Sequence, residues 1–159
     1  MSDPITVRRA QPDDLDAALR LWAHLDAEQA RLDSTLATAE DAQALWAAEF
    51  DALVGTEAGG FFVAVVDGAV VALITARLLT PPPLYASDLY AFVDELVVDQ
   101  AARQRGVGAR LVEAVRVWAR EQGVSRIEAR VVAGNSGALD FWGRVGAEEV
   151  ARTVRLKLS

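Results

Sequence analysis

The residues best suited to binding chemistry form a short loop, Arg103-Gln-Arg-Gly-Val-Gly108, between an apolar run and a helical pattern. Its two glycines let backbone N–H groups approach a ligand without an intervening Cβ. At the start of a helix these N–H groups lack intrahelical partners and lie at the positive end of the helix dipole, which favours phosphate. Two arginines add bidentate donors for an anion. The loop therefore predicts a pyrophosphate cradle, and the alternative is a glycine-softened turn with solvated arginines.

Other glycine-rich phosphate loops fit this segment poorly. A dinucleotide-binding fingerprint requires Gly or Ala where Leu111 stands, and it requires an acidic residue at the end of a second strand. A P-loop requires Gly-Lys-Ser/Thr, which is absent from the sequence.

The elements that would position this loop mix strands and helices. Periodicity predicts strands at 5–9, 61–66, 69–75, 90–98, 127–132 and 150–158, and helices from Pro12, at 39–54, at 104–122 and at 136–145. Asp67-Gly68 between two strand-like runs predicts a hairpin. Pro81-Pro82-Pro83 predicts a stiff exposed loop. This order predicts an α+β or mixed α/β sheet in a single domain over residues 1–159.

Composition excludes several classes of site and partner. The chain has no cysteine and one histidine, His24, which we expect on the surface, so a metal site is not expected. The net charge of −7 argues against a nucleic-acid partner and favours cationic small molecules. No apolar run is long enough to span a membrane, and the first residues do not resemble a signal peptide. We therefore expect a cytoplasmic protein with no membrane partner.

Two motifs together resemble the GNAT N-acetyltransferase superfamily. Arg103-Gln-Arg-Gly106-Val-Gly108 matches its (Arg/Gln)-x-x-Gly-x-(Gly/Ala) signature, preceded by Leu96-x-Val98. The segment from Asn135 to Ala147 is similar to the second motif, Asn-x-x-Ala-x-x-Phe-Tyr-x-x-x-Gly-Phe. The resemblance covers roughly residues 90–147, whereas the first half of the chain matches only in element order and length.

The resemblance implies a mixed, mostly antiparallel sheet of about six or seven strands with helices on both faces, and it implies acetyl-CoA as cosubstrate. In this family the strand equivalent to 90–98 carries a bulge and splays from the strand equivalent to 127–132, and pantetheine enters the opening. The residues that would then bind acetyl-CoA are Leu96, Val97 and Val98 for pantetheine, Arg103, Gln104, Arg105, Gly106, Val107 and Gly108 for pyrophosphate, and Asn135 for the pantetheine arm. Asn135 is also a good helix N-cap, and it can serve in both ways.

The chain departs from the second motif at Trp142, where the family often has a tyrosine that protonates the departing thiolate. An indole N–H donates a hydrogen bond but does not act as an acid near neutral pH. We therefore do not transfer the general-acid role. Trp142 either covers the thioester or is a core aromatic.

A carboxylate is the expected proton acceptor, because an amine must lose its proton before it can attack a thioester. Asp94 and Glu95 lie on the strand beside the expected thioester, and we favour Glu95 as the base. Neighbouring strand residues point to opposite faces, so only one should face the reaction unless a bulge intervenes. The alternative is that both acids are ordinary strand residues. Tyr85 and Tyr90 are weaker candidates for the acceptor pocket.

These expectations predict an N-acetyltransferase that moves an acetyl group from acetyl-CoA to a primary amine by direct attack in a ternary complex, and they favour a small amine or a polyamine-like acceptor. Two alternatives stay open at this point. One is a non-catalytic acyl-CoA-binding sensor, and the other is an enzyme that acetylates amines of proteins or peptides. The resemblance also leaves a homodimer open, because dimers are common in that family.

Overall fold

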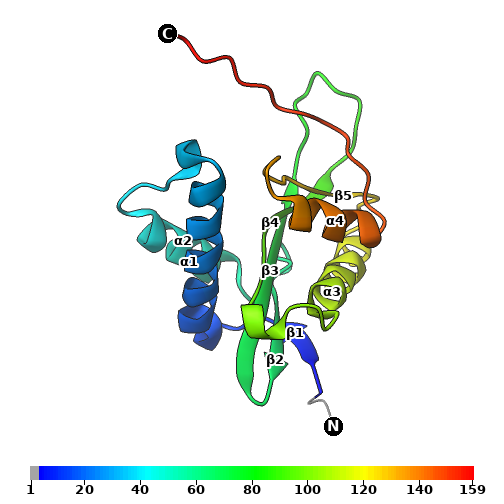
Figure 1. The fold of residues 1–159 in the computed structure, drawn as a ribbon. Helices are drawn as coiled ribbons and strands as arrows, with labels where there is room; N and C mark the ends of the chain where they lie inside the picture. Colours follow the sequence, from blue (N-terminus) through cyan, green and yellow to red (C-terminus); the bar gives the residue numbers. More distant parts are fainter. Residues whose placement is uncertain (1–3) are drawn as a thin grey trace.

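The computed structural model describes residues 4–159, and its strands form one sheet of order β1-β2-β3-β4-β5 (Figure 1). All neighbouring pairs are antiparallel except β4 and β5, which are parallel. This confirms the mixed, mostly antiparallel sheet, with five strands where six or seven were expected. The strands are β1 (Thr6–Arg9), β2 (Phe62–Val66), β3 (Ala69–Leu79), β4 (Tyr90–Val98) and β5 (Ile127–Ala129).

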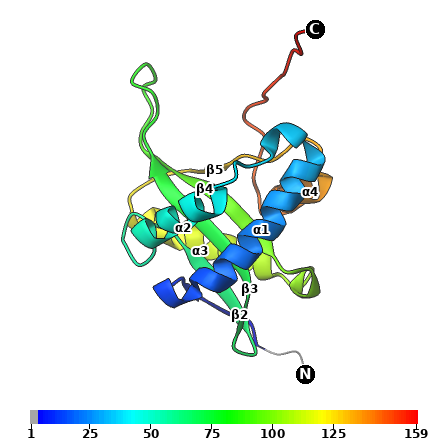
Figure 2. The same ribbon diagram turned by 90° about the vertical axis from the view of Figure 1, so that its left-hand side faces the viewer.

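Helices cover both faces of the sheet, as expected (Figures 1 and 2). On one face lie α1 (Leu15–Leu32) and α2 (Ala42–Leu53), and on the other lie α3 (Val107–Glu121) and α4 (Ser136–Arg144). Short 3-10 turns occur at Pro12–Asp14, Ser34–Leu36 and Gln100–Ala102. No helix among residues 4–159 is long and apolar enough to cross a membrane.

The hairpin predicted at Asp67-Gly68 joins β2 to β3. Asp67 has a φ of 51° and Gly68 a φ of 75°, so both central residues adopt the left-handed conformation that a tight hairpin turn requires. The structure therefore confirms the hairpin, and the turn starts the antiparallel pairing of β2 with β3 at Val66 and Ala69.

Each face of the sheet has its own apolar core. On the α3 side the core includes Trp118, which is 1% exposed and donates its indole N–H to the carbonyl of Glu57 over 3.0 Å. On the α1 and α2 side, Trp46 stacks on Trp22 and on Phe50, with ring centroids 5.8 and 5.5 Å apart. The aromatic stack fixes α2 against α1 and the sheet.

The closing strand predicted at 150–158 is wrong for this structure. Residues 147–159 form neither helix nor strand and are exposed throughout. The run predicted as a strand at 127–132 is also shorter, since β5 ends at Ala129. Apolar alternation makes a segment able to form a strand, but a strand also needs a neighbouring edge for its backbone hydrogen bonds. Within residues 4–159 the last segment lies on no such edge.

Gly60 tests how tightly the α3-side core is packed. A Cβ there would lie 2.6 Å from Cε3 of the buried Trp118, so we expect Gly60→Ala to lower the free energy of unfolding by about 1–3 kcal/mol through overpacking. Gly143 of α4 is the matched control, because a Cβ there meets nothing within 4 Å. Gly143→Ala should leave stability unchanged or raise it by up to about 1 kcal/mol. Urea denaturation measures both, and equal effects would contradict the packing described.

Candidate functional site

A bulge at Asp94 divides β4 into two halves. Thr75 of β3 pairs with Glu95, and the next residue, Ala76, pairs with Val93, so Asp94 is an extra residue in β4. Beside it, β5 pairs with β4 only as far as Val93. After that point β5 and the chain that follows diverge from Leu96–Val98, so the sheet opens where the bulge lies.

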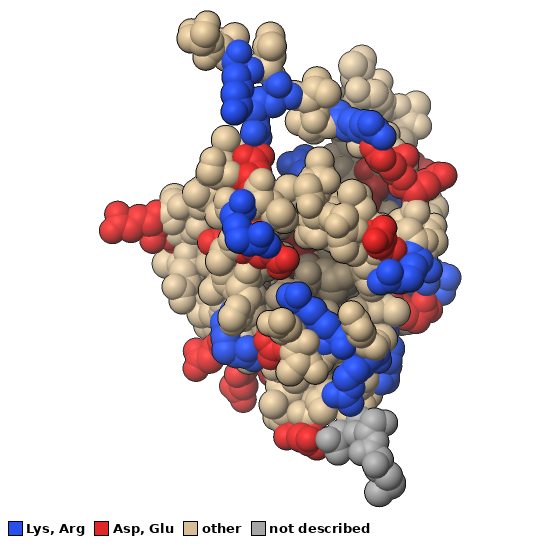
Figure 3. Space-filling view, in the orientation of Figure 1, with Lys and Arg blue, Asp and Glu red and all other residues tan. Residues whose placement is uncertain are grey.

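The divergence creates a cleft between α1, β4, the end of β5 and α4. Its empty volume, including open solvent, is about 460 Å³. Figure 3 shows this side of the molecule hollowed at its centre, with both basic and acidic side chains around the hollow. The walls include Leu25 and Gln29 of α1, Asp94 and Leu96 of β4, and Asn135 and Trp142 of the α4 region.

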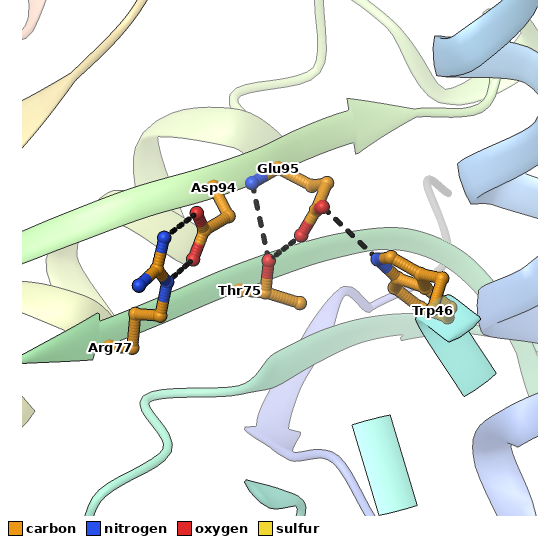
Figure 4. Close-up of polar contacts among 5 residues, drawn as sticks. All are labelled: Trp46, Thr75, Arg77, Asp94 and Glu95. Atoms are coloured by element: carbon orange, nitrogen blue, oxygen red, sulfur yellow. Dashed lines mark hydrogen bonds and ion pairs between the residues drawn. The ribbon is translucent and has the colours of Figure 1, made fainter. Parts of the chain in front are cut away.

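The bulge places both carboxylates of β4 on the same face of the sheet (Figure 4). Asp94 accepts hydrogen bonds of 2.8 and 3.1 Å from Arg77, and Glu95 accepts one from the hydroxyl of Thr75. Thr75 and Arg77 are two residues apart on β3, so they share a face. The alternation of strand residues predicts that only one of the two acids faces the reaction unless a bulge intervenes. The bulge at Asp94 is such a case, so both acids lie on one face.

Glu95 is held between β3 and α2. Its Oε1 accepts the indole N–H of Trp46 over 3.0 Å, its Oε2 accepts the hydroxyl of Thr75, and its own N–H donates to that hydroxyl over 3.2 Å (Figure 4). Thr75 is 1% exposed. These bonds fix the carboxylate in one orientation facing α2, whereas Asp94 contributes to the cleft wall.

Burial raises the pKa of Glu95 to about 7. Desolvation is the largest cause, and the nearby charges of Asp94 and Glu49 raise the pKa as well. The hydrogen bonds from Thr75 and Trp46 act in the opposite direction, because they stabilise the ionised form. A carboxylate with a pKa near neutrality can exchange protons efficiently at neutral pH.

The glycine-containing loop forms the N-terminus of α3, as predicted. Gly106 is its N-cap with a φ of 75°, and Gln104 also has a positive φ of 64°. Gly108 permits a close approach of α4, since a Cβ there would lie 3.0 Å from Cε2 of Phe141. The backbone N–H groups at this end lie at the positive pole of a 15-residue helix. The arrangement suits an anion.

Arg103 is tied to β4 rather than free in solvent. Its Nε donates to the carbonyl of Val98 over 3.1 Å, and its guanidinium lies 3.9 Å from the carboxylate of Glu28 on α1. The loop therefore sits directly after the part of β4 that borders the cleft. Leu96 lines the cleft, whereas Val97 is 6% exposed and packs on the α1 and α2 side.

Asn135 and Trp142 both line the α4 side of the cleft. The side chain of Asn135 accepts the N–H of Ala138 over 3.0 Å, which confirms the N-cap. The ring of Trp142 packs edge-on against Phe141 with centroids 5.5 Å apart. Trp142 is partly buried against the α3-side core and also lines the cleft.

Three sequence candidates lie outside this arrangement. His24 is exposed on α1, as expected. Tyr85 is 63% exposed in the connection between β3 and β4. The ring of Tyr90 is covered by the guanidinium of Arg126, 4.3 Å from its centroid. Within residues 4–159 no group of His, Asp and Glu side chains is placed to hold a metal ion.

Sequence reasoning missed three partners of the carboxylates: Trp46, Thr75 and Arg77. Trp46 and Thr75 were expected only as members of an apolar helix and an apolar strand. Arg77 lies beyond the strand predicted at 69–75, which extends to Leu79 in the structure. The pairing partner of each carboxylate depends on strand register, and the local sequence carries no signal for it.

Comparisons with known proteins agree with this geometry. A family model described as Acetyltransferase (GNAT) family matches residues 18–147. An uncharacterized N-acetyltransferase of Methanocaldococcus jannaschii is 30% identical over 100 residues, which are 63% of this chain but only 44% of that relative. This chain therefore spans less than half of the length of that curated relative.

Solved structures show the same fold. A mutant of the BH1408 protein of Bacillus halodurans is 22% identical with a TM-score of 0.85, covering 97% of this chain and 99% of that one. The aminoglycoside N-acetyltransferase AAC(6')-Iy, in complex with CoA, is 19% identical with a TM-score of 0.76, covering 99% and 97%. Since the family model spans most of the chain and contains the bulge, the α3 loop and the whole motif from Asn135 to Ala147, the chain belongs to the acetyltransferase (GNAT) family.

Proposed function

We propose that this chain forms a single acetyltransferase domain that transfers an acetyl group from acetyl-CoA to a primary amine of a small cationic acceptor. The observation that carries the proposal is the divergence of β4 from β5 at Asp94, which opens a cleft lined by Asp94, the residue next to the buried, hydrogen-bonded Glu95. Family membership supports the use of acetyl-CoA.

In this proposal the cosubstrate lies along the cleft and ends at α3. The backbone of Leu96–Val98 borders the opening left by β5, so its polar groups are available to the amides of pantetheine. The N–H groups at the start of α3 receive the pyrophosphate, with the glycines allowing its close approach. Asn135 and Trp142 cover the arm from the α4 side.

Glu95 is the proposed proton acceptor, directly or through one water molecule. The neutral amine attacks the thioester carbonyl, the C–N bond forms, the C–S bond breaks, and the amine proton passes to the carboxylate. No tyrosine stands at Trp142 to protonate the sulfur. A thiol of pKa near ~8.5 can leave as the thiolate, so a phenolic acid is not required. The chain has no cysteine to form an acyl-enzyme, which favours direct attack.

Charge supports a cationic acceptor. Glu49, Asp94 and Glu95 gather near one compensating cation, Arg77, and the whole chain carries a net charge of −7. A negative field of this kind concentrates amines, which are protonated in solution, beside the group that deprotonates them. The similar fold of an aminoglycoside N-acetyltransferase agrees with an acceptor that carries several amines.

The first prediction tests the pyrophosphate cradle. Gly106→Asp adds a carboxylate at the N-terminus of α3, where it would repel phosphate, so CoA affinity should fall at least about tenfold. Gly123→Asp is the matched control, at the other end of α3. Gly123 has a φ of 76° against 75° for Gly106, and a Cβ at either position meets nothing within 4 Å. Calorimetric titration should show weakened CoA binding for the first variant only; equal affinities would remove the cradle assignment.

The second prediction tests the base. Glu95→Gln should lower kcat about 100-fold near neutral pH, because the amide cannot accept the amine proton. The loss should shrink at high pH, where more of the acceptor is already neutral. Asp94→Asn is the comparison, since the neighbouring acid is paired with Arg77. Thiol release from acetyl-CoA with a panel of amines and aminoglycosides measures turnover. A larger loss for Asp94→Asn would assign the base to Asp94 instead.

The third prediction concerns the donor that α2 provides to Glu95. Trp46→Phe keeps the aromatic stack but removes the indole N–H that stabilises the ionised carboxylate, so the pKa of Glu95 should rise. Ionised Glu95 is the active form, so the acidic limb of kcat/KM against pH should move upward by about one unit. Trp22→Phe is the control, because Trp22 stacks on Trp46 without bonding Glu95. If the acidic limb of the pH profile does not move in Trp46→Phe, Glu95 is not the group whose titration produces it.

A further inference from the structure

Arg130 is a cation on the cleft wall to which the proposed reaction gives no role. Among the described residues that line the cleft, only Asp94 and Arg130 are charged. Asp94 is bound by Arg77, which approaches it from β3 (Figure 4). Arg130 is exposed, and its guanidinium makes no hydrogen bond or ion pair with any residue in the range 4–159. Because an arginine stays protonated, the cleft wall carries one positive charge that no carboxylate binds.

The register of the sheet places Arg130 where β4 and β5 separate. The last pair of this ladder joins Val93 to Ala129. The next residues are Asp94, which forms the bulge, and Arg130, which begins the stretch that diverges from β4. Arg130 therefore lies where the cleft begins, across from the part of β4 that carries the two carboxylates.

This position is at the end of the cleft away from α3. The loop that opens α3 follows Val98, so the proposed pyrophosphate site borders the last residues of β4. Arg130 lies beside Asp94, at the other end of the stretch of β4 that borders the cleft. In the proposed function the acetyl group must reach Glu95, so the sulfur of the cosubstrate would lie at the Arg130 end.

The proposed reaction transfers one negative charge to that sulfur. The C–N bond forms, the amine proton passes to Glu95, the C–S bond breaks, and its electron pair stays on the sulfur. Glu95 becomes neutral while the sulfur becomes a thiolate. Asp94 disfavours an anion at this place, and the indole of Trp142 on the same wall supplies no acidic proton. A positive charge fixed where the anion forms lowers the barrier to its departure.

We propose that Arg130 stabilises the departing thiolate as an ion pair, so that the sulfur leaves without being protonated. This role rests on the proposed function, because only a thioester cosubstrate produces this anion. A guanidinium is too weak an acid to donate a proton, so its contribution is electrostatic. The same ion pair would form with the thiolate of the product CoA, and it would lower the pKa of that thiol in the complex.

Few titratable groups face the expected position of the sulfur. The side chains that α1 and the α4 region contribute to the cleft wall do not titrate: Leu25, Gln29, Asn135, Ala138 and Trp142. On the sheet, Asp94 is held in its ion pair with Arg77. Glu95, with a pKa of about 7, is ionised in the alkaline range where a thiol titrates. A difference between variants at Arg130 therefore isolates the effect of its charge.

Titration of the thiol of bound CoA tests this role without turnover. The protein is saturated with CoA, the ultraviolet absorbance of the thiolate is followed against pH, and the complex with desulfo-CoA supplies the baseline. Arg130→Gln should raise the pKa of the bound thiol by about one unit, because the neutral amide no longer stabilises the thiolate. Arg130→Lys keeps a cation and should restore most of the difference. Arg120→Gln is the matched control, because it removes the same charge from an exposed residue of α3 outside the cleft, and it should leave the pKa unchanged.

Steady-state kinetics and calorimetry complete the test. Arg130→Gln should lower kcat for acetyl transfer about tenfold, in line with a change of one pKa unit, and should leave CoA affinity within about twofold of the parent value. Weaker CoA binding with an unchanged thiol pKa would assign Arg130 to a phosphate of the cosubstrate, and an unchanged pKa at full affinity would leave it a solvated cation. Either result would overturn the proposal. If the parent chain does not bind CoA at all, the proposed function itself fails.

Discussion

The extra residue at Asp94 is the constraint on which the site depends. Before it, Ala91 and Val93 pack into the α3-side core; after it, Leu96 and Val98 pack on that side, so the parity of β4 is reversed. A strand without the insertion would keep alternating and would place one of the two acids in the α3-side core. The same insertion bends β4, and β5 pairs with it only up to Val93. One backbone irregularity therefore produces both the cleft and the orientation of the carboxylates beside it.

The pKa of Glu95 depends on a balance between burial, which raises it, and hydrogen bonds from two donors, which lower it. Desolvation, the largest cause, raises the pKa and so favours the protonated form, which cannot accept a proton. The hydrogen bonds of Thr75 and Trp46 favour ionisation and hold its pKa to about 7. Trp46 keeps its position because it stacks between Trp22 and Phe50. The aromatic packing of α1 and α2 is therefore part of what sets the protonation of a residue on β4.

Features that depend on local sequence could be predicted, and features that depend on register could not. The strand at 90–98, the turn at Asp67-Gly68 and the loop that opens α3 follow from periodicity and glycine chemistry within a few residues. The bond from Trp46 to Glu95 joins residues 49 apart and exists only because α2 packs over the bulged strand. Arg77 becomes the partner of Asp94 through the register of β3 against β4. No pattern of residue types along one segment encodes such a register.

The segment after α4 shows a different limit. A two-residue alternation predicts that a segment can pair as a strand, and it predicts which side of that strand is apolar. It does not predict which sheet edge the segment pairs with. In this structure the chain turns at Gly146 after α4 and leads away from its own sheet (Figure 1), so residues 150–158 pair with no strand among residues 4–159. The alternation therefore predicts which side of the segment is apolar, whereas the path of the chain decides whether a strand forms.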